Sequence, residues 1–140
     1  MKNRILALDP GSKRIGAAIS DPLGISAKPL DYIPGSSWRK IISGVKQLIQ
    51  EHQPGLIVVG LPLNLDGSHS FSTEKALELV KRLEKFIQIP IKTVDERLTS
   101  REANNILIEG DVRRAQRKQV VDSMAACLIL KKYLEQGVEE

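Results

Sequence analysis

The sequence contains almost none of the features that export, anchor or cross-link a protein. Cys127 is its single cysteine, which excludes an internal disulfide and a cysteine-rich zinc site and fits a reducing compartment. No stretch approaches the roughly 20 apolar residues that a membrane-spanning helix needs. The apolar run at residues 5–8 is too short for a signal peptide, and Asp9 interrupts it. We therefore expect a cytoplasmic protein that does not contact membranes.

Aromatic residues are also scarce, at five of 140. This scarcity argues against a surface that binds single-stranded nucleic acid by base stacking. The hydrophobic content of 41% suffices for a core, and the length fits one compact domain over residues 1–140, with no room for two. The net charge of +4 is compatible with a polyanionic partner.

Hydrophobic patterning predicts five strands and four helices. Short apolar runs between turn residues indicate strands at residues 3–9, 14–20, 27–33, 56–59 and 91–94. Apolar residues at helical spacing indicate one helix that ends near residue 53, one that begins at Ser72, and two more at residues 99–110 and 118–135. The short link between the first two strands forces an antiparallel hairpin, and Pro29 favours an edge position for the third. This order predicts an α/β fold, a mixed five-stranded sheet with helices on both faces.

Acidic residues stand at critical places in three of these elements. Asp9 closes the first strand, at the carboxyl end where open sheets of this kind form a ligand crevice; a simple Asp-Pro-Gly turn is the alternative. Asp95 and Glu96 close the fifth strand on opposite faces, so only one of them can face the crevice. Asp122 lies on the apolar stripe of the last helix, where an inward carboxylate is costly unless it is paired or binds a metal. The alternative for Asp122 is an ion pair with a basic neighbour.

Carboxylates are the main candidates for metal ligands, because His52 and His69 lie in polar surface segments and the cysteine is isolated. Oxygen ligands favour Mg²⁺ or Mn²⁺ over Zn²⁺. Such ions suit phosphodiester hydrolysis, since they activate water and stabilise the leaving oxygen without a covalent nucleophile. Four basic residues just before the last helix are candidates for phosphate contacts, although a solvated loop explains them as well: Arg113, Arg114, Arg117 and Lys118.

Four segments resemble the motifs of the YqgF family, a group of Holliday-junction-resolvase-like proteins in the RNase H-like superfamily. They are residues 8–18 (LDPGSKRIGAA), 59–67 (VGLPLNLDG), 95–100 (DERLTS) and 121–126 (VDSMAA). One such segment is weak evidence, but four in the same order over nearly the whole chain are highly specific. Pro10 is a mild departure, because Tyr, Phe or Val is more usual after the first aspartate of the family.

The resemblance implies an RNase H-like fold in a cytoplasmic bacterial nuclease that processes the 5′ end of the 16S ribosomal RNA precursor. Resolution of branched DNA is the older proposal for the group, and either a monomer or a homodimer is compatible with the sequence. The resemblance also implies Asp9, Glu96 and Asp122 as the catalytic, metal-binding triad. In such a sheet Glu96 lies two strand spacings (~10 Å) from Asp9, so Asp66 or Asp95 stays open as a ligand instead.

Residues around the triad are candidates for substrate contacts. They are Lys13 and Arg14 in the hairpin, Asn64, Asp66 and Gly67 in the loop after the fourth strand, and Arg97 and Thr99 after Glu96. For the loop residues, a structured turn is an equally good explanation.

Two other functional classes remain open. Actin-like ATPases and sugar kinases also begin with Asp-x-Gly and a hairpin, but they need two such domains, and the chain has no Walker-type sequence. A catalytically silent RNA-binding factor would keep the fold and its phosphate contacts. The variant Asp9→Asn separates the last class from a nuclease, because an enzyme loses cleavage whereas a binder keeps its affinity.

Overall fold

The computed structural model describes residues 4–11, 13–23, 26–64, 66–95 and 114–135, with residues 114–123 and 135 described by their backbone alone. Along the chain these form β1 (Ile5–Pro10), β2 (Arg14–Ser20), β3 (Ala27–Pro34), α1 (Trp38–His52), β4 (Leu56–Leu61), α2 (Phe71–Phe86), β5 (Ile91–Asp95) and α4 (Arg114–Glu135). The helix expected at residues 99–110 lies outside the described residues. Of the helices that are described, none combines the length and apolar composition that crossing a membrane requires.

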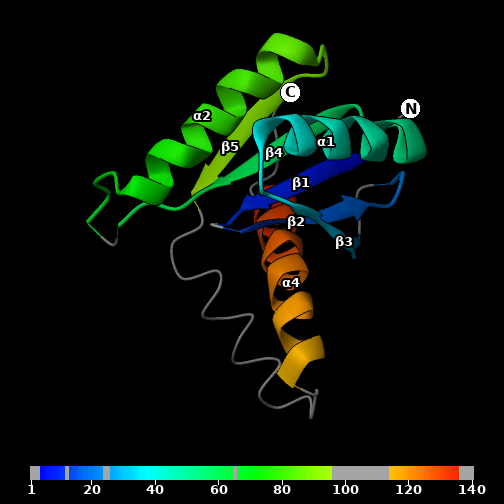
Figure 1. The fold of residues 1–140 in the computed structure, drawn as a ribbon. Helices are drawn as coiled ribbons and strands as arrows, with labels where there is room; N and C mark the ends of the chain where they lie inside the picture. Colours follow the sequence, from blue (N-terminus) through cyan, green and yellow to red (C-terminus); the bar gives the residue numbers. More distant parts are fainter. Residues whose placement is uncertain (1–3, 12, 24–25, 65, 96–113, 136–140) are drawn as a thin grey trace.

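The sheet has the strand order β3-β2-β1-β4-β5 (Figure 1). The central strand β1 pairs antiparallel with β2 and parallel with β4. The antiparallel strands on one side of β1 are joined by short turns, and the parallel strands on its other side are joined through helices. β3 extends the antiparallel half, and β5 extends the parallel half. This arrangement confirms the mixed five-stranded sheet, the initial hairpin and the edge position predicted from Pro29.

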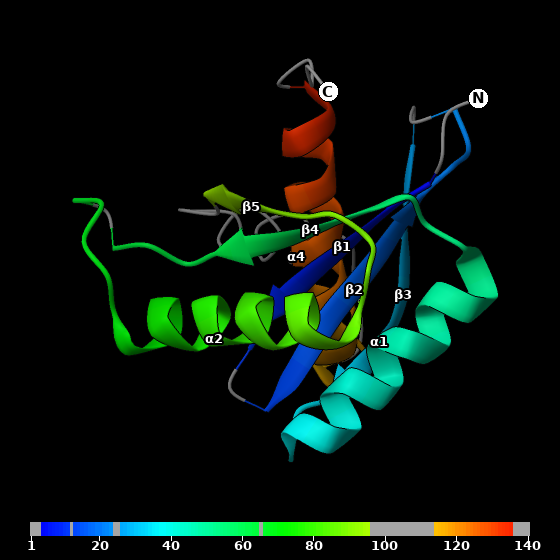
Figure 2. The same ribbon diagram turned by 90° about the horizontal axis from the view of Figure 1, so that it is seen from above.

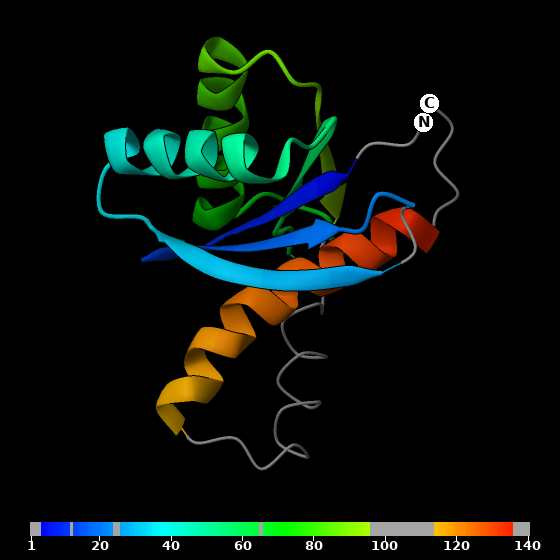
Figure 3. The ribbon, with the colours of Figure 1, turned by 90° about the vertical axis from the view of Figure 1, so that its right-hand side faces the viewer.

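The helices form one layer on each side of the sheet. α1 and α2 cover one face and α4 crosses the other, as Figures 1 and 3 show. Alternation along β1 supplies both cores, because Leu6 and Leu8 pack beneath α1 and α2 whereas Ala7 packs beneath α4. Ala126 of α4 lies in the same cluster as Ala7 and Ala18, all without exposed surface. These small residues let α4 lie close to the sheet.

The apolar stripes predicted for the helices are the ones that the fold buries. The buried residues of these stripes are Ile41 and Val45 in α1, Ala76, Leu79 and Leu83 in α2, and Ala125, Ala126, Ile129 and Tyr133 in α4. Cys127 is a buried free thiol in α4. Burial raises the pKa of Cys127 from 9.0 to about 11, and the nearby Lys131 ammonium opposes this only in part.

The start of α2 differs by one residue from the prediction. The helix begins at Phe71 rather than Ser72, because Ser70 is its N-cap. The Ser70 hydroxyl accepts a hydrogen bond from the backbone N–H of Thr73 at 3.2 Å, and the Thr73 hydroxyl accepts one from the backbone N–H of Ser70 at 2.9 Å. This reciprocal pair satisfies two donors of the first turn and fixes where the helix begins.

The start of α4 corrects a second prediction. The helix begins at Arg114 and not at Lys118. Arg114 and Arg117, which we predicted in a linker before the helix, are therefore part of it. The physical reason is that Arg, Ala, Gln and Lys are all good helix formers, and no glycine or proline interrupts residues 114–118.

Candidate functional site

Asp9 occupies the carboxyl end of the central strand, on the face that α4 covers. Ala7, two residues earlier on the same face, is fully buried beneath α4, whereas Asp9 is partly buried. Its cross-strand partner on β2 is Gly16. The register of β1 with β4 pairs Leu8 with Val59, and its continuation by one residue puts Gly60 on the other side of Asp9. Both flanking positions are thus glycines, which have no side chain to cover the carboxylate.

Glycine also fixes the tight turn that joins β1 to β2. The backbone N–H of Gly11 donates to the carbonyl oxygen of Arg14 at 2.8 Å. A Cβ atom at position 11 would lie 2.6 Å from that same oxygen, so a larger residue requires the turn to shift. The backbone N–H of Gly35 donates to the carbonyl oxygen of Lys13 at 3.0 Å and ties the turn to the segment before α1. Lys13 and Arg14 therefore lie at the same end of the sheet as Asp9, where β1 turns into β2.

Arg14 is a predicted site residue whose side chain contacts an aromatic ring. It precedes Gly16 by two residues on β2, so it lies on the same face of the sheet as Asp9. Its guanidinium carbon is 4.8 Å from the centre of the Tyr32 ring on β3, a cation–π contact. Tyr32 was not among the predicted site residues. The signal for it is its place on the neighbouring strand, two residues before Pro34, the partner of Arg14.

The end of β5 indicates the face of the sheet on which Glu96, the next residue, is expected. Val94 is buried in the cluster beneath α4, and Asp95, opposite Leu61 of β4, falls on the other face by alternation. The backbone carbonyl oxygen of Asp95 accepts a hydrogen bond from the Lys132 ammonium of α4 at 2.6 Å, which joins this strand end to the helix. The predicted residues Glu96, Arg97 and Thr99 lie outside the described residues.

α4, the helix that contains Asp122, packs on the same face of the sheet. Asp122 is within this helix, and Ala126, Ile129 and Tyr133 on its predicted stripe are buried against the sheet. The side chain of Asp122 lies outside the described part of the structure, as do those of Arg114, Arg117 and Lys118 and the whole of Arg113. Among the side chains that are described, no three potential metal ligands come together.

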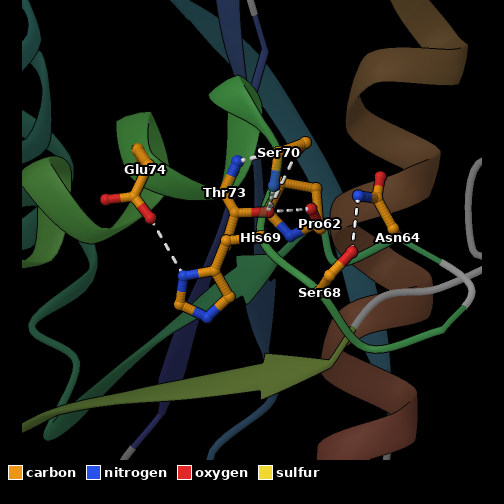
Figure 4. A network of polar contacts seen from close by, with 7 residues as sticks. All are labelled: Pro62, Asn64, Ser68, His69, Ser70, Thr73 and Glu74. Carbon is orange, nitrogen blue, oxygen red and sulfur yellow. Dashed lines mark hydrogen bonds and ion pairs between the residues drawn. The ribbon is translucent and has the colours of Figure 1, made fainter.

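The loop between β4 and α2 forms a turn closed by its own hydrogen bonds (Figure 4). The Asn64 amide nitrogen donates to the Ser68 hydroxyl at 2.9 Å, and the Ser68 hydroxyl donates to the Asp66 carboxylate at 2.6 Å. Gly67 has a φ of 87°, a left-handed conformation that favours glycine. Asn64, Asp66 and Gly67 therefore form the structured turn that was one of the two expectations for this loop.

Thr73 anchors this loop to the first turn of α2. Its side chain has no exposed surface, and its hydroxyl donates to the carbonyl oxygen of Pro62 at 2.6 Å (Figure 4). On the outer side of the loop, the His69 ring nitrogen lies 2.9 Å from the Glu74 carboxylate. Neither contact was predicted, although Ser70 and Thr73 at this spacing are a recognisable capping signal. The loop is thus fixed where β4 leaves the sheet, at the same edge as Asp9.

Comparison with known proteins gives a match over nearly the whole chain. The profile of the RuvX family, described as Holliday junction resolvase, matches residues 3–136. A Desulforamulus reducens protein named "Putative pre-16S rRNA nuclease" is 42% identical over 136 residues, which cover 97% of this chain and 99% of that protein. A Thermoanaerobacter pseudethanolicus protein of the same name is 46% identical over 133 residues, 94% of this chain and 96% of its own length.

Two solved structures with a similar fold are resolvases of low sequence identity. Thermus thermophilus RuvC, in complex with Holliday junction substrate, has a TM-score of 0.59 at 15% identity, with 96% of each chain covered. The fowlpox virus Holliday junction resolvase has a TM-score of 0.59 at 12% identity, covering 96% of this chain and 99% of its own. These likenesses concern the fold and confirm the predicted fold class.

Proposed function

The chain belongs to the RuvX family of Holliday junction resolvases, and from this premise we propose that it is a metal-dependent nuclease that processes the 5′ end of the 16S ribosomal RNA precursor. The name of the similar bacterial proteins supports the RNA substrate. The observation that carries the proposal is the position of Asp9, partly buried between two glycines at the carboxyl end of β1 on the face that α4 covers. A ribosomal RNA substrate would place the protein in the cytoplasm.

Asp9, Glu96 and Asp122 are the proposed catalytic carboxylates. Glu96 is expected on the face of Val94, which packs beneath α4, and Asp122 belongs to α4 itself. Oxygen donors on one side of the sheet fit Mg²⁺ or Mn²⁺, and such an ion supplies activation of water and stabilisation of the leaving oxygen when bound. In this proposal β1, the end of β5 and α4 each contribute one carboxylate to a single site on the face that α4 covers.

Phosphate groups next to the scissile bond would meet cations that the hairpin supplies. Lys13 and Arg14 follow Asp9 across a turn that two backbone hydrogen bonds hold, and Tyr32 packs against the Arg14 guanidinium. Cations bind phosphate oxygens irrespective of sequence and set the position of the strand. Further proposed contacts are Asn64, Asp66, Gly67, Arg97, Thr99, Arg113, Arg114, Arg117 and Lys118.

The test is cleavage of a 5′-extended 16S ribosomal RNA fragment by the purified full chain in Mg²⁺ or Mn²⁺. The wild type should shorten the fragment. Asp9→Asn should lose cleavage, because the proposed site loses one carboxylate. The variant should still bind the fragment at least as tightly, because one negative charge facing the phosphates is removed. Asp31→Asn is the matched control, since Asp31 is an exposed carboxylate on β3 and not part of the proposed site. Binding by the wild type without cleavage would contradict the proposal and indicate an RNA-binding factor without turnover.

Resolution of a four-way DNA junction is the second candidate, favoured by the description of the family and by the fold of the RuvC-like neighbours. A resolvase makes paired cuts in two strands and therefore acts as a symmetric dimer. The same assay with a four-way junction, together with the mass of the protein in solution, separates the two candidates. Paired cuts by a dimer, without cleavage of the RNA fragment, would favour the junction.

A further inference from the structure

α1 and α2 form an open groove on the face of the sheet opposite Asp9. Figure 2 shows one end of α2 next to α1 on this face. The groove has a volume of about 500 Å³, and Trp38, Ile42 and Phe86 supply much of its apolar surface. Three cations also line it, Arg39, Lys46 and Arg82, and none of the described residues that line it is acidic. An apolar floor with cationic sides fits a ligand that is flat, apolar and anionic.

The aromatic rings of the groove are flanked by positive charge. The Arg82 guanidinium lies 4.5 Å from the Trp38 ring centre, and the Lys46 ammonium lies 5.8 Å from that of Phe86. Phe86 is 52% exposed, a large apolar surface to leave in water. Glu78 pairs with Arg82 at 2.7 Å, so Arg39 and Lys46 are the cations better placed to meet an added anion.

The groove begins at the edge of the sheet where Asp9 lies. The hydrogen bond from Gly35 to Lys13 joins the β1–β2 turn to the segment that leads into α1, and Trp38 is the first residue of that helix. Figures 2 and 3 both show the start of α1 beside this hairpin. The groove therefore opens close to the turn that follows Asp9, although it lies on the other face of the sheet.

We propose that this groove binds an unpaired nucleotide of the same nucleic acid that the Asp9 site cleaves, with its base against Phe86 beside Trp38 and its phosphate on Arg39 and Lys46. The inference rests on the proposed function, because that function supplies the polyanion. Aromatic rings beside cations are the usual means of binding single strands, and the volume lies within the ~300–1,000 Å³ typical of ligand pockets. The scarcity of aromatic residues excludes an extended stacking surface but not one position built from two of the five.

Trp38 is the single tryptophan of the chain, so its fluorescence reports on this groove directly. The experiment titrates the full chain and its Asp9→Asn variant with an eight-nucleotide oligouridylate in EDTA. We expect the oligonucleotide to quench Trp38 in both proteins, because the groove lies on the face opposite Asp9. Phe86→Ala should weaken binding by about 5- to 150-fold through the lost stacking. Lys46→Glu should also weaken binding, whereas the control Lys28→Glu, an exposed lysine of β3 that does not line the groove, should leave it within about twofold.

The inference is overturned if Trp38 fluorescence stays constant while anisotropy shows the oligonucleotide bound, or if Phe86→Ala and Lys46→Glu bind as the wild type does. A response of Trp38 to an acidic amphipathic peptide in that case would assign the groove to a protein partner instead. Loss of this inference leaves cleavage of the ribosomal RNA fragment unaffected. Quenching that depends on Phe86 and Lys46, in a protein that cleaves no substrate, would support the groove and contradict the nuclease.

Discussion

The buried hydroxyl of Thr73 allows a quantitative test of how the β4–α2 loop is held. Thr73→Val keeps the shape of the side chain and removes its oxygen. The carbonyl oxygen of Pro62 then loses the donor that lies at 2.6 Å, and the backbone N–H of Ser70 loses its acceptor at 2.9 Å. Thr73 has no exposed surface, so water does not take the place of the hydroxyl without a structural change.

The expected loss follows from these two hydrogen bonds. A polar group left without its partner in the interior costs about 1–3 kcal/mol. Pro62 and Ser70 are only partly buried, which puts each cost near the lower end. We therefore expect Thr73→Val to lower the free energy of unfolding by about 2–3 kcal/mol, and Tm by roughly 6–10 °C for a chain of this length.

Urea denaturation and calorimetry on the purified variants measure this effect. Thr73→Ser is the matched control, because it keeps the hydroxyl and loses only a buried methyl group worth about 1 kcal/mol. Thr73→Val should therefore be the less stable of the two. Equal stability of Thr73→Val and the wild type, or a Thr73→Ser variant less stable than Thr73→Val, would refute the importance assigned to this hydroxyl.

Three further predictions concern the hairpin and the interior. Gly11→Ala places a Cβ atom 2.6 Å from the Arg14 carbonyl oxygen and should cost about 1–3 kcal/mol in urea denaturation, so unchanged stability would contradict the account of the turn. Arg14→Ala should reduce the slope of log K against log salt for RNA binding by about 0.7–0.9, whereas Lys28→Ala should not change it. Between pH 9 and about 11 the Cys127 thiol ionises in the unfolded chain but stays protonated in the native protein. The free energy of unfolding should therefore fall as the pH rises, by up to about 3 kcal/mol more in the wild type than in Cys127→Ala.

The fold could be predicted from local signals that the tertiary structure also requires. The short turn after Asp9 permits only a hairpin. Pro29 has no backbone N–H to donate to a neighbouring strand, so it is tolerated on an edge strand. The helix starts were less certain. The pattern predicts the start of α2 at Ser72, and the reciprocal bond between Ser70 and Thr73 moves it one residue earlier. At the start of α4, positive charge indicated a loop, although the residues themselves favour a helix.

The site could be predicted in part. Strand alternation puts Asp9 on the face of Ala7, and the two core clusters separate Ala7 from Leu6 and Leu8 in this way. The triad as a whole stays a prediction, because Glu96 and the Asp122 side chain lie outside the described residues. The α1–α2 groove could not be predicted, since it depends on how two helices distant in sequence meet, and the pattern of α1 alone shows only its buried stripe.

Manganese binding by the full chain, measured by isothermal titration, tests the central claim most directly: that Asp9, Glu96 and Asp122 form one metal site. Each of Asp9→Asn, Glu96→Gln and Asp122→Asn should weaken binding by at least about tenfold, because each removes one charged oxygen ligand. Asp66→Asn and Asp95→Asn should bind Mn²⁺ as the wild type does. Wild-type affinity in any of the first three variants, or loss of binding in either of the last two, would contradict the proposed site.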